Sequence, residues 1–207
     1  MALLTTRLEA APSTSPERAW SGRQTEVLDA FEALILAEGF RHLTVGGLAT
    51  RLGCSRRTLY ELAPSKDELV AVTVDRYLDR LLADAFATVA RHRSPTRQLE
   101  AAAELIARHL APLAPPVTAD VAASPRIAAS ISEFAARFAD GLADVIAAGI
   151  EQGQFRRVHP HLVAEAILGL VDRLLDPAVL ARLDLTYDEA ARQITRLFLD
   201  GIRRPAR

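Results

Sequence analysis

Apolar residues recur every three or four positions through most of this chain, which is the spacing of one buried face of an amphipathic helix. The first clear segment runs from Gln24 to Gly39, where the glycine can end the helix. No segment alternates apolar and polar residues between turn signals, as a half-buried strand would. The pattern therefore predicts an all-α protein without a sheet.

Start and stop signals divide the later part of the chain in the same way. Ser65 and Glu68 have the spacing of a capping box ahead of a long helix over residues 66–90. Prolines and glycines then mark the ends of the helices that follow. We expect these helices from Ser94-Pro95 to Pro112 and over residues 118–123, 125–152, 160–175 and 187–202, with a loop after Asp176-Pro177.

Residues 43–66 predict two short helices separated by a tight turn. Thr44 and Ser55 are good N-caps for the first and the second helix, and Gly53 can adopt the left-handed geometry between them. Leu59 and Leu62 would point inward. This is the layout of a helix-turn-helix, whose second helix presents polar groups to the major groove of DNA. Its outward face would carry Arg56, Arg57, Thr58, Tyr60 and Glu61.

These elements divide the chain into three parts. Residues 1–21, rich in Ala, Pro, Ser and Thr, form a flexible arm, in which Arg18, with Arg23 just beyond, either has no role or contacts phosphates or a minor groove. Residues 22–66 form the DNA-binding domain, with the motif at residues 44–63. Residues 67–207 form a larger helical domain.

Composition narrows the function classes. The net charge of −1 argues against a strongly basic coat protein, so DNA contact must come from locally placed arginines and amides. Cys54 is the only cysteine, which excludes an intrachain disulfide; a buried structural thiol is favoured over a redox switch. Neither a convincing signal peptide nor an apolar run of about 20 residues appears, so cytoplasmic residence is the default.

The DNA contacts can be assigned by side-chain chemistry. Arg56 and Arg57 can each bond to guanine O6 and N7, although solvated or phosphate-only positions are the alternative. Thr58 suits a phosphate or a thymine methyl group, and Tyr60 suits a phosphate or half-buried packing. The first helix offers free amides to a phosphate, and Lys66 suits the same phosphate. The full predicted set is Thr44, Val45, Gly46, Ser55, Arg56, Arg57, Thr58, Tyr60 and Lys66.

At these residues the chain resembles the TetR family of bacterial transcription regulators. The likeness rests on Thr44-Val45, Leu48-Ala49, Gly53-Cys54-Ser55, Thr58-Leu59-Tyr60 and Pro64-Ser65-Lys66, and extends to residues 149–156 and 197–202. The resemblance implies three DNA-binding helices, a long connecting helix, and a helical domain that binds a small molecule and dimerises. It also implies that the connecting helix transmits ligand binding to the DNA-binding helices.

The chain departs from the family pattern at a few positions. Leu62 replaces an aromatic residue or histidine, and Ala63 replaces a phenylalanine, whose space Trp20, Phe31 or Phe40 would have to fill. Gly46-Gly47 is unusual in a first helical turn, where each glycine costs up to about 1 kcal/mol relative to alanine.

The resemblance implies two further sites. The apolar faces of the last two long helices are either ordinary core or a twofold bundle between subunits, at Leu162, Ala166, Ile167, Leu170, Leu174, Ile194, Leu197 and Phe198. A ligand pocket would lie among the connecting helix and the two long helices after it. Its candidate residues are Phe86, Leu105, His109, Leu110, Phe134 and Phe138, although a lone histidine such as His109 is more often a packing residue.

No enzymatic signature appears in the chain. It has no zinc-protease, nucleophile-elbow, phosphate-loop or dinucleotide pattern, and His159-Pro160-His161 lacks the further ligands of a metal site. We therefore expect no cofactor, no metal, no membrane association and no catalysis. The expected function is a homodimeric repressor released from a palindromic DNA operator by a small-molecule effector. The alternatives are a helical ligand-sequestering or partner-binding protein and, last, a helical enzyme without a recognisable motif.

Overall fold

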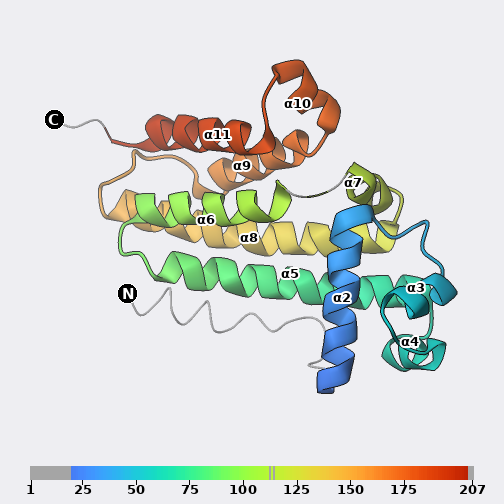
Figure 1. Cartoon of the computed structure of the whole chain (residues 1–207). Helices are drawn as coiled ribbons and strands as arrows, with labels where there is room; N and C mark the ends of the chain where they lie inside the picture. The colour runs from blue at the N-terminus through green and yellow to red at the C-terminus, as the bar shows by residue number, and fades with distance from the viewer. Residues whose placement is uncertain (1–19, 112, 114, 205–207) are drawn as a thin grey trace. The chain divides into compact units, whose positions relative to one another are not determined.

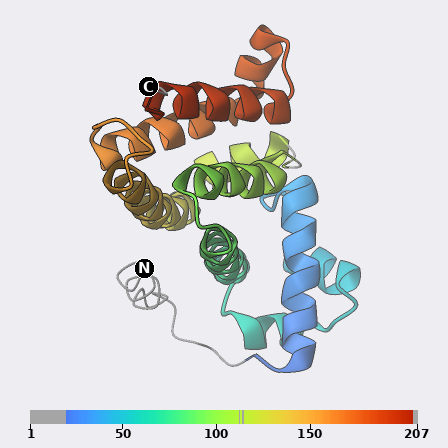
Figure 2. The same ribbon diagram turned by 90° about the vertical axis from the view of Figure 1, so that its left-hand side faces the viewer.

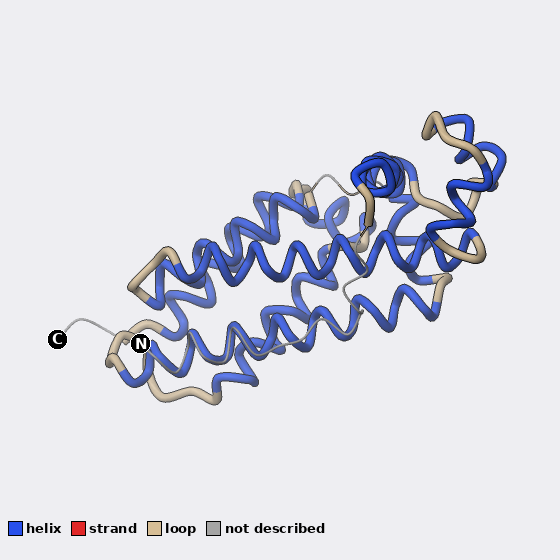
Figure 3. Tube along the Cα trace, turned by 90° about the horizontal axis from the view of Figure 1, so that it is seen from below, coloured by secondary structure: helices blue, strands red, loops and turns tan. Residues whose placement is uncertain are grey.

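A computed structural model describes residues 20–111, 113 and 115–204, and all regular elements in these residues are helices (Figures 1 and 3). The predicted arm at residues 1–21 lies outside the described residues, apart from Trp20 and Ser21. The all-α prediction is confirmed. The helices are α2 (Gly22–Glu38), α3 (Val45–Arg51), α4 (Arg56–Leu62), α5 (Lys66–Ala90), α6 (Pro95–Leu110), α7 (Pro115–Ala122), α8 (Pro125–Glu151), α9 (Pro160–Leu174), α10 (Pro177–Leu183) and α11 (Tyr187–Ile202).

The described residues form two compact units. The head unit contains residues 20–81 and the described part of 113–132, and the C-terminal unit contains residues 82–111 and 133–204. Helices α5 and α8 each contribute one part to each unit. The units follow packing, so the functional boundary between residues 66 and 67 stays a prediction.

The head unit is held together by one apolar cluster drawn from α2, α3, α4 and the first turns of α5. Leu28, Phe31, Leu48 and Leu62 have no exposed surface. Capping fixes the helix starts: Ser21 and Gln24 form a capping box for α2. Burial of several large side chains, each worth about 1.5–3 kcal/mol, stabilises helices that are too short to persist alone.

Ion pairs add a second link between α2 and α5 in the head unit. Arg76 Nη2 lies 2.7 Å from Asp29 Oδ1, and Arg80 Nη2 lies 2.5 Å from Glu32 Oε2. The hydrogen bond from Arg76 lowers the pKa of the Asp29 carboxyl. Asp29 is half exposed, so this pair adds little stability compared with the apolar cluster.

In the C-terminal unit, α11 packs against α6 and α9, and Figure 2 shows it (red) beside α9 (orange). The end of α11 is tied to the loop after α8 by main-chain bonds. Arg156 N donates to Ile202 O at 2.8 Å, and Arg204 N donates to Gln154 O at 2.9 Å. These bonds form an isolated bridge between Phe155 and Arg203 rather than a strand.

One element was predicted wrongly. Helix α10 occupies Pro177–Leu183, where a loop was expected after Asp176-Pro177. Asp176 is in fact its N-cap, because the side chain accepts a hydrogen bond from the Ala178 amide at 2.9 Å. The Asp-Pro pair both stops α9 and starts a new helix, since proline fits the first helical turn.

Ala63 belongs to a hydrophobic cluster that includes aromatic residues. Ala63 is buried in the same cluster as Phe31 and Phe40, and Trp20 packs against this cluster. These are the three residues expected to compensate for the missing phenylalanine.

We therefore predict that Ala63→Phe overpacks the head unit and lowers the free energy of unfolding by about 1–3 kcal/mol. Urea denaturation followed by circular dichroism measures this. Ala33→Phe, on the exposed side of α2, serves as the control and should change stability by no more than about 0.5 kcal/mol. A raised melting temperature for Ala63→Phe would mean that the space is empty.

Candidate functional site

Helix α4 is anchored on one side and open on the other. Leu59 and Leu62 are 2% and 0% exposed, which fixes the rotation of this short helix. Ser55 Oγ accepts a hydrogen bond from Thr58 N at 3.0 Å and caps the helix as predicted. Arg56, Arg57 and Tyr60 are exposed on the opposite side, as the sequence pattern requires.

The two exposed arginines of α4 have different surroundings. Arg57 Nε donates to Glu61 Oε1 at 3.0 Å, but both side chains are mostly exposed, so the pair is weak and easily exchanged for another acceptor. The Arg56 guanidinium instead lies against α3: a Cβ atom on Gly46 would lie 2.7 Å from Arg56 Nη2. The absence of a side chain at Gly46 thus leaves room for the Arg56 guanidinium. From the sequence alone, this glycine appeared only as a residue that lowers helix stability.

The turn before α4 and the start of α3 have the expected geometry. Gly53 has φ +59°, and Thr44 Oγ1 accepts a hydrogen bond from Gly47 N at 3.1 Å. Val45, the first residue of α3, packs against the head cluster. Arg23 donates to Gly53 O at 3.1 Å and so ties α2 to this turn.

The loop between α2 and α3 is held from two sides. Lys66 Nζ donates to Phe40 O at 3.3 Å and to Arg41 O at 3.2 Å. On the other side, Asp120 Oδ2 accepts from Phe40 N at 2.6 Å and from Arg41 N at 2.9 Å. We call this arrangement, made by Lys66, Asp120 and the main chain of residues 40 and 41, the loop clamp.

The sequence analysis missed Asp120. The residue is 8% exposed and lies in α7, where it is the only charged side chain of the helix. A single carboxylate in an otherwise uncharged short helix is the signal that could have indicated a buried acceptor. Gly39 makes room for it, because a Cβ atom there would lie 2.6 Å from Asp120 Oδ2 and the residue has φ +81°.

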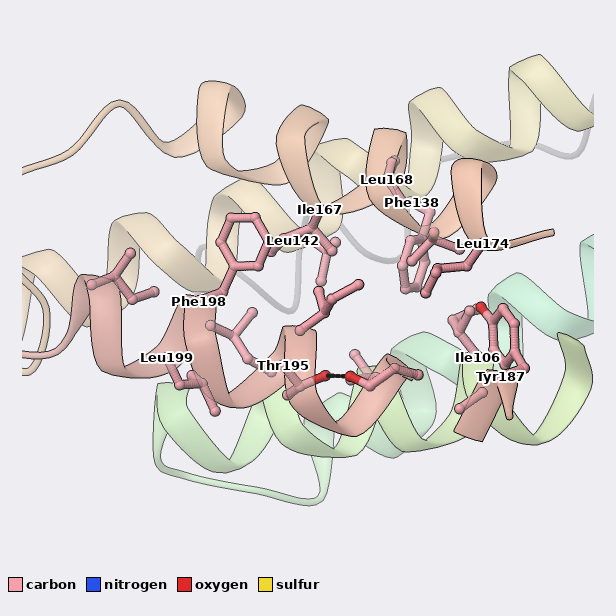
Figure 4. Close-up of a pocket in the computed structure, with 18 residues that line it drawn as sticks. Ile106, Phe138, Leu142, Ile167, Leu168, Leu174, Tyr187, Thr195, Phe198 and Leu199 are labelled. Carbon is pink, nitrogen blue, oxygen red and sulfur yellow. Dashed lines mark hydrogen bonds between the residues drawn. The ribbon is translucent and has the colours of Figure 1, made fainter. Parts of the chain in front are cut away.

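The C-terminal unit contains an apolar cavity between α6, α8, α9 and α11 (Figure 4). The cavity has a volume of about 70 Å³. Its wall carries two hydroxyls, from Tyr187 and Thr195. The lining residues are Leu99, Ala102, Ala103, Ile106, Ala107, Phe138, Leu142, Ile167, Leu168, Val171, Leu174, Tyr187, Ala191, Ile194, Thr195, Phe198, Leu199 and Ile202.

Of the six predicted ligand residues, Phe138 lines this cavity. Phe134 stacks on Phe138 with ring centroids 5.9 Å apart, and the Phe86 ring packs against Gly141 instead. Leu105 is buried, while His109 and Leu110 are half-buried near the end of α6. Contact of these residues with a ligand stays a prediction.

The predicted dimer residues fall on two faces. Leu162, Ala166, Leu170 and Leu197 are exposed, and the leucines are 68%, 39% and 70% exposed in that order. The other four side chains turn toward the cavity of their own subunit: Ile167, Leu174, Ile194 and Phe198.

The remaining candidates have structural surroundings. Burial raises the pKa of the Cys54 thiol, which disfavours the reactive thiolate. His159 caps α9, where its Nδ1 accepts from Leu162 N at 3.4 Å. Within residues 20–111, 113 and 115–204 there is no group of three or more metal-ligating side chains, and no helix there is long and apolar enough to cross a membrane.

Two family models match the chain. The model for bacterial regulatory proteins of the tetR family matches residues 27–73, which contain the helix-turn-helix. The model for a tetracyclin repressor-like C-terminal domain matches residues 128–195. No curated protein gives a significant match.

Solved structures share the fold. A protein from Saccharomonospora viridis, solved in complex with choline, has a TM-score of 0.77 at 19% identity, over 90% of this chain and 100% of that one. A TetR transcription regulator from Haloarcula marismortui has a TM-score of 0.70 at 20% identity, over 89% and 100%. PfmR, a TetR family regulator from Thermus thermophilus, has a TM-score of 0.62 at 25% identity, over 86% and 99%.

A helix-turn-helix followed by a helical C-terminal domain defines the class of DNA-binding transcriptional regulators. The chain belongs to the TetR family, since the two matched ranges together span more than half of it. The resemblance carried by residues 44–66 is thereby confirmed. Members of this family are transcriptional regulators, which are generally not enzymes.

The loop clamp leads to a stability prediction. Asp120→Ala leaves the amides of Phe40 and Arg41 without their acceptor, so the free energy of unfolding should fall by about 1–3 kcal/mol. Hydrogen exchange of these two amides should also accelerate. Asp120→Asn should lose less, because the amide oxygen still accepts.

Asp84→Ala is the matched control, since this carboxylate is exposed on α5. If Asp120→Ala were no less stable than Asp84→Ala, the clamp would not contribute to holding the loop.

Proposed function

We propose that this protein is a homodimeric repressor that leaves a palindromic operator when a small molecule binds its C-terminal unit. It acts in the cytoplasm and catalyses no reaction. The observation that carries the proposal is the two-sided α4: two leucines fix the helix, and two arginines and a tyrosine are exposed on its other side.

The DNA contacts follow from this geometry. Arg56 and Arg57 supply bidentate donors for guanine, worth about 1–3 kcal/mol of base discrimination each. Tyr60, 54% exposed, offers a hydroxyl to a phosphate. The remaining proposed DNA contacts, made by main-chain amides or by smaller side chains, come from Thr44, Val45, Gly46, Ser55 and Thr58. Lys66 is a cation that donates to two carbonyls, which do not neutralise it, so it still attracts a nearby phosphate.

A second copy of the chain is the occupant that fits the exposed side of α9 and α11. Leu162, Leu170 and Leu197 account for most of the large exposed apolar side chains among the described residues. In a dimer related by a twofold axis at these helices, all three leucines of both copies would be buried. It would also supply the second helix-turn-helix that a palindromic operator requires.

The cavity suggests the route by which a ligand acts. Its walls include the inner faces of α9 and α11, and its lining contains no residue of the connecting helix α5. A ligand there would therefore shift the packing of the dimer helices directly. For release to follow, it must bind the released state more tightly than the DNA-bound state. The choline complex of the Saccharomonospora viridis protein supports the idea that this fold holds a small molecule.

The arginines give the first functional prediction. Arg56→Ala and Arg57→Ala should each weaken binding to the operator by about 5- to 150-fold, from the 1–3 kcal/mol of base discrimination. Binding to random DNA should weaken much less. Gel shifts against the DNA upstream of the protein's own gene, at stated salt, measure both.

Lys66→Ala is the comparison variant, because a phosphate contact carries no base information. It should weaken both kinds of binding about equally and reduce the salt dependence by roughly one counterion. If both arginine variants kept the wild-type preference for the operator, base reading would have to lie elsewhere.

The dimer gives the second functional prediction. Leu170→Arg or Leu197→Arg should convert the protein to monomers, because each would bring a charge into an apolar contact. Light scattering at micromolar concentration measures the mass. Leu183→Arg, on the 48%-exposed leucine of α10, is the matched control and should remain dimeric. A monomeric wild-type protein would contradict the proposal.

A further inference from the structure

The cavity in the C-terminal unit has an almost entirely apolar lining. Its 18 lining residues include no charged side chain, and all but two are apolar. Moving an ionised group into such surroundings without a partner is strongly unfavourable. A molecule bound inside must therefore be uncharged over the part that is enclosed.

The cavity is also long. Both Tyr187 and Ile202, the first and last residues of α11, belong to its lining. At 1.5 Å per residue, the helix between them spans about 22 Å. Figure 4 shows the labelled side chains following α11 from Leu199 and Phe198 at one end to Tyr187 at the other. The cavity volume of about 70 Å³ is small for this length, which favours a chain-like molecule over a bulky polycyclic one.

The two hydroxyls differ in what they can offer. Thr195 Oγ1 donates to Ala191 O at 2.8 Å, so it retains only acceptor capacity. Burial raises the pKa of Tyr187 to about 12, so the phenol stays protonated near neutral pH. Among the described residues the structure gives the Tyr187 hydroxyl no hydrogen-bond partner, and the side chain is 7% exposed. A bound molecule can supply the missing partner.

We propose that this cavity binds an elongated, uncharged, mainly aliphatic molecule with one hydrogen-bonding group, which pairs with the hydroxyl of Tyr187. The inference rests on the proposed function in that this molecule would be the effector. It adds the chemical class of the ligand and the residue that recognises its polar group.

A neighbouring polar hollow defines the competing outcome. It lies between α6 and α11 and shares part of its wall, including Ala103 and Thr195, with the cavity. Its charged lining residues are four arginines and three acidic residues: Arg97, Arg108, Arg192, Arg196, Glu100, Glu104 and Asp188. A chain with an anionic head could place its tail in the cavity and its head in this hollow. The proposal states that the neutral molecule binds better.

Three ten-carbon probes separate these outcomes on the full chain: 1-decanol below its solubility limit, and decanoate and decyltrimethylammonium below their micelle concentrations. Calorimetry and thermal shift should show saturable binding of 1-decanol, with both ionic probes at least tenfold weaker. Equal or tighter binding of decanoate or decyltrimethylammonium would overturn the proposal, and so would the absence of decanol binding.

Variants test the assignment to Tyr187. Tyr187→Phe should weaken decanol binding about two- to tenfold, the range of one neutral hydrogen bond. Tyr77→Phe, at a half-buried tyrosine of the head unit, is the matched control and should bind as the wild type does. Ala191→Leu should fill the cavity and abolish binding without unfolding the protein. An unchanged affinity of Tyr187→Phe would refute the role of this hydroxyl.

The same probes keep the two proposals apart. Binding is measured without DNA, and a gel shift with and without 1-decanol then asks whether the operator is released. Decanol binding without release would leave the ligand class intact and contradict the repressor mechanism. Release by another molecule, with no decanol binding, would do the reverse.

Discussion

The burial of Leu59 and Leu62 against the head cluster is the contact on which the proposed DNA recognition by α4 depends. Helix α4 has seven residues, and a helix of that length is not stable alone in water. Its existence and its rotation are therefore set by two buried leucines and by the Ser55 cap. Loss of either leucine would disorder the arginines without removing them.

The head cluster also explains why the departures from the family pattern are compatible with a regulator. Ala63 has aromatic neighbours in its cluster, and Gly46 gives the Arg56 guanidinium a place to lie. The loop clamp adds rigidity at the entrance to α3, because both the carbonyls and the amides of residues 40 and 41 are bonded. Helix α7 supplies half of this clamp, and only four residues separate it from the cavity-lining helix α6.

Helices α9 and α11 are apolar on two faces for two different reasons. Ile167, Leu174 and Phe198 face a cavity inside the subunit, while Leu162 and Leu197 face outward. In the proposed dimer this helix pair lies between the ligand site and the subunit contact. No further element is then needed to couple them, because a shift of either face moves the other.

The sequence alone determined most of the helices, the caps at Thr44 and Ser55 and the buried face of α4, since these follow from apolar spacing and from local hydrogen bonds within a few residues. Local signals failed at α10, because an Asp-Pro pair can either end a helix or start a new one. They also could not separate the cavity face of α9 and α11 from the exposed face, because leucine and isoleucine suit both environments equally. Only the tertiary structure decided this, and only it brought Asp120 to the loop at residues 40 and 41, about 80 positions away in the chain. Contacts between distant segments depend on how whole helices pack, and no periodicity within one helix encodes its partner.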